Sequence, residues 1–154
     1  MRKHVLLLHG PNLNRLGRRD PEHYGKLTLA ELEQAVAGWA DERGFELEAF
    51  QSNHEGALID ALQQASGRVC AAIVNLGALT HTSYALHDAL LDFGKPVVEV
   101  HLSAISERES WRRVSVIRPA CVAHVEGLGI EGYRIALDTL VVELSRREDR
   151  EEHE

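Results

Sequence analysis

The sequence predicts an α/β fold, namely a doubly wound, five-stranded parallel sheet with the flavodoxin-like strand order 2-1-3-4-5 and helices on both faces. Short apolar runs rich in valine, leucine and isoleucine alternate with stretches whose apolar residues recur at helical spacing. Such strands are typical of parallel sheets that are buried on both faces. Five of these units follow one another without an internal repeat, and five strands favour the flavodoxin-like order. The 154 residues fit one domain, which we expect over residues 1–146.

The elements can be placed in chain order. The first strand is expected at His4–Leu8 and leads through a turn into a long loop that ends near Lys26. Thr28 predicts the start of the first helix, because Glu31 three residues later completes a capping box. A short charged helix or loop is expected at Ser106–Arg113. The other strands are expected at Phe45–Phe50, Cys70–Val74, Val97–Ser103 and Ala120–Val125. Three further helices are expected from their apolar stripes, the first with Leu58 and Leu62, the second with Leu86 and Leu90, and the third with Tyr133, Ala136 and Leu140.

Composition and charge narrow the functional classes. The formal net charge of -7 argues against a general nucleic-acid binder, and no apolar run approaches the roughly 20 residues of a membrane span. The apolar run near the N-terminus stops at His9–Pro11 without a cleavage pattern, so we expect a first strand and not a signal peptide. Cys70 and Cys121 lie in apolar segments, where we expect the buried free thiols of a cytoplasmic protein. Residues 147–154 are expected to form a charged, disordered tail.

The fourth predicted strand carries two residues with chemical potential. Glu99 and His101 interrupt an otherwise apolar run, and residues two apart on a strand share a face at a spacing of roughly 7 Å. A buried carboxylate is costly unless it is paired, and His101 is its natural partner. The pair would orient the ring, which makes His101 a candidate general acid, although a purely structural His–Glu pair has the same pattern.

Polar residues collect where the predicted strands end. In doubly wound sheets, ligands bind beyond these carboxyl ends, so this edge is the expected site. The residues are His9 with Asn12, Ser52 with His54, Asn75 with His81, and Glu99 with His101 and Ser103. Six arginines also fall into two short clusters, which suits either an anion site or a scattered basic surface; they are Arg15, Arg18, Arg19, Arg108, Arg112 and Arg113.

Several chemistries lack their motifs. No His-Glu-x-x-His or Cys-x-x-Cys metal motif is present, although histidines from different strands could still converge on a metal. Ser103 lacks the Gly-x-Ser-x-Gly elbow of a serine hydrolase. The turn Gly10–Asn14 matches neither a dinucleotide-binding motif nor a P-loop, and it lacks the Ser/Thr-rich phosphate turn of a flavin site. His9 and Asn75 stand where a receiver domain would need acidic residues.

Acid–base chemistry on an anionic small molecule remains. Lys3 and Lys95 precede strands and Lys26 closes the long loop, which disfavours a Schiff base with a buried lysine. The long loop offers Tyr24 as a base, because a neighbouring guanidinium would favour the phenolate. Tyr24 could equally be a packing residue in the turn before Gly25. A non-catalytic flavodoxin-like binding module is the alternative of another class.

Ordered blocks along the chain carry a more specific signal. They are Gly10–Asn14, Leu16–Gly17, Arg19, Pro21, Tyr24–Gly25, Gln51–Gly56, Asn75, Thr80–Ser83, Glu99–Ser103, Arg108–Glu109, Arg112, Gly127–Gly129 and Gly132–Tyr133. Together, from His4 to about Val142, these blocks resemble the type II 3-dehydroquinate dehydratases of the shikimate and quinate pathways. The departures are Ala104 for a usual Asn, Leu79 for Tyr, Leu76 for Pro and Asp20 for Glu, none of which removes a proposed catalytic group.

The resemblance implies a reaction and the residues that perform it. Tyr24, activated by Arg19, would remove the C2 proton of 3-dehydroquinate. Asn12 would help to stabilise the enolate, through a water. His101, oriented by Glu99, would protonate the departing hydroxyl in an anti elimination to 3-dehydroshikimate.

The resemblance also implies how the substrate is held and how the chain assembles. The lid Arg15–Lys26 would close over the substrate. The implied protein needs no metal or cofactor and forms homo-oligomers, namely dodecamers built from trimers. The further site residues are Asn75, Leu102 and Ser103 for the carboxylate, His81 and Arg112 for the ring hydroxyls, Asp88 presented by a neighbouring subunit, and Arg108 at the flank of the site.

Overall fold

The protein is described here by a computed structural model that covers residues 2–18, 20, 22 and 26–153. The predicted roles of Arg19 and Tyr24 therefore fall on residues outside the described part. The strands are β1 (Lys3–His9), β2 (Phe45–Gln51), β3 (Val69–Asn75), β4 (Val97–His101) and β5 (Ala123–Glu126), and the helices are α2 (Leu29–Glu42), α3 (Glu55–Ala65), α4 (Tyr84–Phe93) and α5 (Glu131–Glu152).

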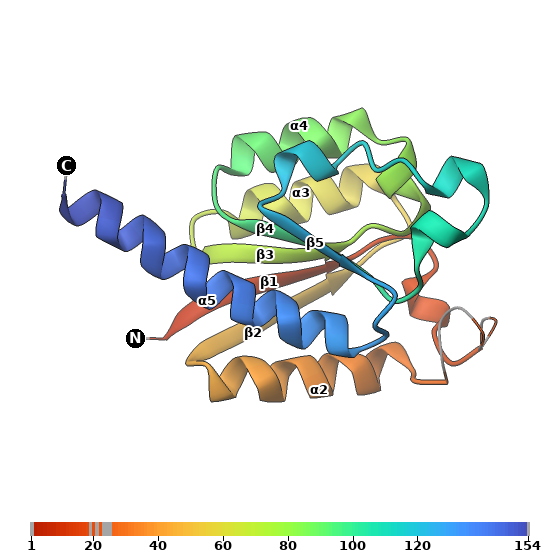
Figure 1. Cartoon of the computed structure of the whole chain (residues 1–154), viewed down its shortest axis with the longest axis horizontal. Coiled ribbons are helices and arrows are strands. Elements are labelled where there is room, and N and C mark those ends of the chain that lie inside the picture. The colour runs from red at the N-terminus through yellow and green to blue at the C-terminus, as the bar shows by residue number, and fades with distance from the viewer. Residues whose placement is uncertain (1, 19, 21, 23–25, 154) are drawn as a thin grey trace.

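The strands form one parallel sheet in the order β2-β1-β3-β4-β5, which confirms the predicted topology. Helices α2 and α5 cover one face of the sheet, and α3 and α4 cover the other (Figure 1). The predicted doubly wound α/β architecture is therefore confirmed. All the βα turns leave from one edge of the sheet, which is the edge where polar residues were expected to collect.

The three central strands, β1, β3 and β4, are buried on both faces because most of their residues on both faces are apolar. In β1, Val5 and Leu7 pack into the cluster beneath α2 and α5, and Leu6 and Leu8 pack into the cluster beneath α3 and α4. Strand β4 follows the same alternation only in part. Its Val98 joins the first cluster, and the opposite face carries Glu99, which is buried like the apolar residues around it. The fold thus places a carboxylate inside the core.

Local signals place most of the helix and strand ends. Thr28 caps α2, and the capping box with Glu31 is present as predicted. Strand β5 begins at Ala123 and not at Ala120, because Arg118–Ala120 forms the short 3-10 turn η5 with a proline in its first turn. The charged segment that follows β4 forms two more 3-10 turns, η3 (Ile105–Glu107) and η4 (Ser110–Arg112).

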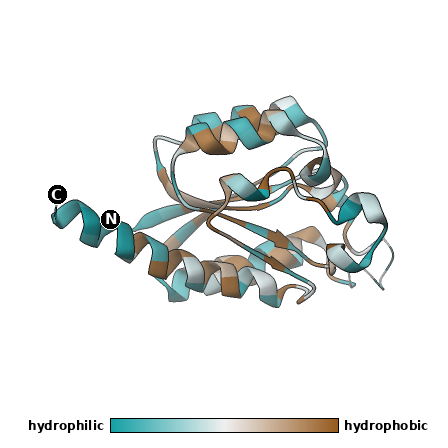
Figure 2. Ribbon diagram, turned by 45° about the horizontal axis from the view of Figure 1, so that its top comes forward, coloured by the Kyte–Doolittle hydropathy of each residue, from teal (hydrophilic) through white to brown (hydrophobic). Residues whose placement is uncertain are grey.

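The C-terminal segment differs from the disordered tail expected over residues 147–154. Helix α5 continues to Glu152, and its last turns project beyond the sheet as a hydrophilic stretch (Figures 1 and 2). Arg147 stabilises this extension, since its Nε donates to Glu143 Oε1 at 3.2 Å and its Nη1 donates to the carbonyl of Gly94 at 3.2 Å. Lys3 forms an ion pair with Glu148. The single domain over residues 1–146 stays a prediction.

Both cysteines are free thiols, as predicted, but they are half-buried and not buried. Desolvation raises the pKa of the Cys70 thiol and raises the pKa of Cys121 to about 12. Within the described residues, none of the helices has the length and apolar character needed to cross a membrane.

Candidate active site

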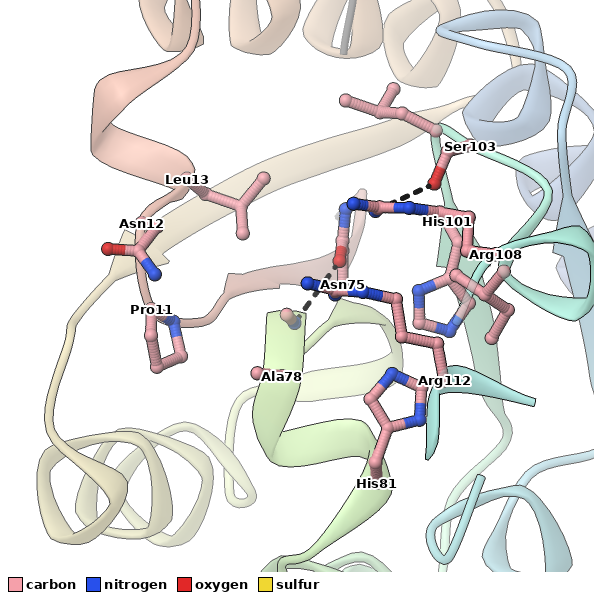
Figure 3. A pocket seen from close by; sticks show the side chains of 13 residues that line it. Pro11, Asn12, Leu13, Asn75, Ala78, His81, His101, Ser103, Arg108 and Arg112 are labelled. Carbon is pink, nitrogen blue, oxygen red and sulfur yellow. Dashed lines mark hydrogen bonds between the residues drawn. The ribbon is translucent and has the colours of Figure 1, made fainter. Parts of the chain in front are cut away.

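A pocket opens at the carboxyl ends of the central strands (Figure 3). Its walls come from the turn after β1, the end of β3, the 3-10 turn η2 (Gly77–His81), the end of β4 and the turns η3 and η4. This is the edge at which ligands bind in open α/β sheets. The described lining residues are Pro11, Asn12, Leu13, Asn75, Gly77, Ala78, His81, His101, Leu102, Ser103, Ile105, Arg108 and Arg112.

Two glycines let the neighbouring strand ends approach each other closely. A Cβ on Gly10 would lie 2.4 Å from the carbonyl carbon of Leu76, so only glycine fits there without a backbone shift. Gly77 has φ +57, and a Cβ on it would lie 2.8 Å from the carbonyl oxygen of Pro11. The turns after β1 and β3 therefore pack backbone to backbone, and they form one wall of the pocket.

The contact that the sequence predicted between Glu99 and His101 is present. The Nε2 atom of His101 lies 2.5 Å from Glu99 Oε2, and the exposed fractions of the two residues are 4% and 0%. Glu99 lies behind the histidine and His101 lines the pocket, so the ring stands between the carboxylate and the ligand space. The arrangement suits a histidine that delivers a proton from an orientation fixed by a carboxylate.

Sequence reasoning missed two further partners of Glu99. Arg118 donates to both carboxylate oxygens, from Nε to Oε1 at 3.2 Å and from Nη2 to Oε2 at 3.2 Å. The Ser115 hydroxyl donates to Oε1 at 3.0 Å. Neither residue belongs to the two arginine clusters or to the motif blocks. The burial expected for Glu99 was the one clue, because a buried carboxylate needs a positively charged partner in addition to a neutral imidazole ring.

This surrounding network keeps Glu99 ionised. Burial alone would raise the pKa of the carboxyl group, but hydrogen bonds and charges from His101 and Arg118 outweigh it and lower the pKa to about 2. Glu99 is thus a carboxylate throughout the physiological range. An ionised carboxylate can only accept hydrogen bonds, so Nε2 of His101 carries the proton of their shared hydrogen bond.

Asn75 is held in place from behind by a helix residue. Its Nδ2 donates to the hydroxyl of Tyr133 at 3.2 Å, and its Oδ1 accepts from the backbone N–H of Gly77 at 3.3 Å. Tyr133 is fully buried on α5, and burial raises the pKa of its phenol to about 12. The neutral phenol and the turn after β3 together fix the amide at the floor of the pocket.

His81 and Arg112 lie on opposite turns and share one aromatic neighbour. The ring of His81 meets the ring of Trp111 edge to face at 5.4 Å, and the guanidinium of Arg112 lies 4.0 Å over the same indole. Nδ1 of His81 is 2.7 Å from the carbonyl oxygen of Val114. Desolvation is the largest cause that lowers the pKa of His81, and the charges of His101 and Arg112 add to it.

The pocket is rich in basic groups. Nη1 of Arg108 donates to Ser103 Oγ at 3.4 Å, and both side chains border the space that Arg112 enters from the next turn (Figure 3). No aspartate or glutamate occurs among the described lining residues. A small anion therefore finds guanidinium, imidazole and hydroxyl groups here, without a carboxylate to repel it.

The other predicted site residues are placed less centrally. Asn12 lines the pocket with φ 72 in the left-handed region, and its backbone N–H donates to Asn53 Oδ1 at 2.9 Å. Arg15 and Arg18 are exposed and are not among the described lining residues. Asp88 is exposed on α4 and also lies outside the described lining, so its predicted role would need a second subunit.

The histidines of the described part do not converge on a metal. Across residues 2–18, 20, 22 and 26–153, no three His, Cys, Asp or Glu side chains form a group that could hold a metal ion. His9 is buried at the end of β1, where its Nε2 lies 3.2 Å from Glu33 Oε1. It is directed toward α2 and does not join the lining of the pocket.

Comparisons with known proteins agree with this geometry. The family model for dehydroquinase class II matches residues 3–141. A catabolic 3-dehydroquinase 1 from Aspergillus terreus is 47% identical over 148 residues, which cover 96% of this chain and 97% of the relative. A 3-dehydroquinate dehydratase from Bacillus pumilus is 49% identical over 140 residues, covering 91% and 95%. The crystal structure of a type II dehydroquinase from Butyrivibrio crossotus superposes with a TM-score of 0.88 at 39% identity, covering 90% of this chain and 97% of the other.

Proposed function

Because the chain belongs to the class II dehydroquinase family and is a hydro-lyase of the 3-dehydroquinate dehydratase type, we propose that it eliminates water with a tyrosine base and a histidine acid. The product would be 3-dehydroshikimate, formed through an enolate. The observation that carries the acid assignment is the buried Glu99–His101 pair at the wall of the basic pocket. Family membership decides against the non-catalytic binding module that the sequence left open.

The acid step follows from the geometry of the pair. His101 donates one ring proton to Glu99 through Nε2, and its other ring nitrogen would act on a ligand in the pocket. The electron pair of the enolate forms the new carbon–carbon double bond as the C–O bond of the leaving hydroxyl breaks. The departing oxygen takes a proton from His101 and leaves as water.

The base step belongs to Tyr24 in this proposal. A phenolate takes the C2 proton, and the electrons of that bond move into the adjacent carbonyl to form the enolate. Arg19 would favour the phenolate through its positive charge, and Asn12 would stabilise the enolate through a water. The pocket wall around Asn12 supports this placement, since Asn12 lines the space opposite His101 (Figure 3).

Substrate binding would use the basic wall and the end of β3. Asn75, Leu102 and Ser103 would hold the carboxylate, and His81 with Arg112 would bind the ring hydroxyls. Arg108 would add a guanidinium to that of Arg112. It lies beside Ser103, because its Nη1 donates to the Ser103 hydroxyl. An anionic substrate is favoured by the excess of basic over acidic groups in the lining.

The experiment that tests the reaction follows product formation directly. Purified protein is mixed with 3-dehydroquinate, and the conjugated enone is followed by its ultraviolet absorbance. We expect steady formation of product. A well-folded protein that forms none would overturn the proposal.

Two treatments of the same assay test the absence of a metal and of an imine. Incubation with a chelator should leave the rate unchanged, and borohydride added together with substrate should not inactivate the protein. Inactivation by the chelator would indicate a metal, and inactivation by borohydride would indicate a Schiff base.

The assignment of Tyr24 as the base is tested by removing its phenol oxygen. Tyr24→Phe removes the phenol oxygen and keeps the ring, so we expect substrate binding to persist while the rate falls by about 10²-fold or more. Isothermal titration with 3-dehydroquinate checks the binding. Turnover close to that of the unchanged protein would assign the base to another group.

Assembly and pathway complete the proposal. We expect a homo-oligomer, a dodecamer of trimers, in which Asp88 of one copy reaches the site of another; light scattering gives the molar mass, and a monomer would contradict it. The reaction fits either the shikimate pathway, and so aromatic amino-acid biosynthesis, or quinate catabolism. The cytoplasmic location expected from the sequence stays a prediction.

A further inference from the structure

Glu99 has more partners than are needed to orient one histidine. It accepts from His101, from two nitrogens of Arg118 and from the hydroxyl of Ser115. We propose that Arg118 is a positioning residue, which keeps Glu99 anionic and in place so that Glu99 can hold His101 through the whole reaction cycle. This inference rests on the proposed function in that it assigns His101 the acid role.

Arg118 is placed to act through Glu99 and not on the substrate. Its guanidinium makes a two-pronged contact with the carboxylate, and its backbone N–H donates to Ser115 Oγ at 3.2 Å. Ser115 in turn donates to Glu99, so the short segment from Ser115 to Arg118 grips the carboxylate at three points. Arg118 is not among the described residues that line the pocket.

The need for a permanent cation comes from the changing charge of the histidine. His101 becomes neutral whenever it has given its proton to the departing hydroxyl. At that moment a fully buried carboxylate would face a neutral ring, and burial would favour taking up a proton on Glu99. A guanidinium stays charged at every working pH, so Arg118 compensates Glu99 at each stage.

An ionised Glu99 also fixes which ring nitrogen faces the ligand. A carboxylate can only accept, so Nε2–H of His101 must point at it. A protonated Glu99 could instead donate to a bare Nε2, which would place the ring proton on Nδ1 in the neutral state and reverse the roles of the two nitrogens. Arg118 therefore acts on the tautomer of the acid as well as on its orientation.

Other charged groups share this neighbourhood and stay in place in the test. His81 interacts with the charges of both His101 and Glu99, and the thiol of Cys121 interacts with Glu99 and Arg118. The side chains of Arg108 and Arg112 line the same pocket as His101. The titratable and charged groups to be kept unchanged are thus His81, Arg108, Arg112 and Cys121.

The test compares three variants, two at Arg118 and one at a control position. Arg118→Met removes the charge and keeps most of the stem, and Arg118→Lys keeps the charge but loses the fork. Arg134→Met removes a charge from the exposed Arg134–Glu131 pair on α5 and serves as the control. The Glu99 carboxyl signal, assigned by its absence in Glu99→Gln, is followed by carbon-13 NMR against pH, and kcat and KM for 3-dehydroquinate are measured over the same range.

We expect Arg118→Met to move the Glu99 titration upward by about one pH unit or more. Its kcat should fall about tenfold, as part of the roughly 10²–10⁴-fold that a general acid contributes, with the acid limb of kcat displaced in the same direction and KM little changed. Arg118→Lys should restore the Glu99 titration, and Arg134→Met should match the unchanged protein.

The outcomes separate this inference from the proposed function. An unmoved Glu99 titration in Arg118→Met would overturn the electrostatic role, and a moved titration with an unchanged kcat profile would overturn the role in catalysis. If the unsubstituted protein forms no product, the proposed dehydration is overturned. A Glu99 titration that still moves in Arg118→Met would then support the contact of Arg118 with Glu99 on its own.

Discussion

Oε2 of Glu99 and Nε2 of His101 lie 2.5 Å apart on the same face of β4, with the carboxylate fully buried and the ring at the wall of the pocket. Two positions along one strand thus supply both an acid candidate and the group that orients it. The alternation of strand side chains makes the pair almost unavoidable once both residues face α3 and α4.

Glu99→Gln keeps the shape of the side chain and removes its charge. The amide oxygen can still accept a hydrogen bond from Arg118, but the ion pair is lost. The NH2 group can point at Nε2 of His101, so the ring loses its fixed tautomer. We expect kcat to fall by about 10²-fold in the enone assay. Glu46→Gln makes the same chemical change at an exposed position of β2 and should have no effect. Equal rates for the two variants would contradict the role of Glu99.

The same carboxylate makes stability depend on pH. The pKa of Glu99 is lowered from 4.5 to about 2, so the unfolded chain binds this proton more readily than the folded protein does. Its contribution, about 3 kcal/mol, is fully present above pH 4.5 and is lost as the pH falls from there toward 2. Urea denaturation across that window measures it. Glu99→Gln should flatten the curve there, and an unchanged slope would refute the assignment.

The close approach of the turns after β1 and β3 depends on Gly10. Gly10→Ala places a Cβ 2.4 Å from the backbone of Leu76, which cannot move without displacing the pocket wall. We expect a loss of about 3 kcal/mol or more in the free energy of unfolding. Gly38→Ala is the matched control, because Gly38 is exposed on α2 and a Cβ there meets nothing within 4 Å. It should stabilise the protein by about 1 kcal/mol.

The hydrogen bond from Asn75 to Tyr133 joins the pocket to the core. Tyr133→Phe removes only the hydroxyl oxygen of the side chain. Nδ2 of the buried Asn75 then lacks this acceptor. The loss should be about 1–2 kcal/mol in stability, and KM for 3-dehydroquinate should rise because the amide that would hold the carboxylate is less well oriented. Tyr84→Phe, at an exposed site on α4, is the comparison and should change neither quantity. A KM equal to that of the unchanged protein would separate Tyr133 from substrate binding.

Much of this arrangement could be predicted from the sequence because it depends on periodicity. Apolar strands that alternate with helices predicted the sheet and its order. Parallel strands bring their carboxyl ends together, so Asn75, His81 and His101 were expected at one edge. The cap at Thr28 depends only on residues next to it in the chain, so it could be predicted from the sequence as well. The charged segments after β4 and at the C-terminus lack such periodicity. The sequence therefore left the first open as a helix or a loop, and it did not predict the helical end of α5.

Arg118 shows why the rest could not be predicted. It lies 19 positions after Glu99 in a 3-10 turn, and tertiary packing of that turn against α4 accompanies the contact. Nothing in the spacing of the two residues signals it. The helical end of α5 is similar, since the ion pair of Lys3 with Glu148 joins the two ends of the chain. Contacts of this kind are set by tertiary packing, which a single sequence does not reveal.

The measurement that tests the central claim most directly is the kcat of His101→Ala with 3-dehydroquinate, followed by enone absorbance. If His101 is the acid held by Glu99, kcat should fall by about 10²–10⁴-fold while KM changes little. A kcat close to that of the unchanged protein would contradict the assignment of the acid to the buried pair on β4.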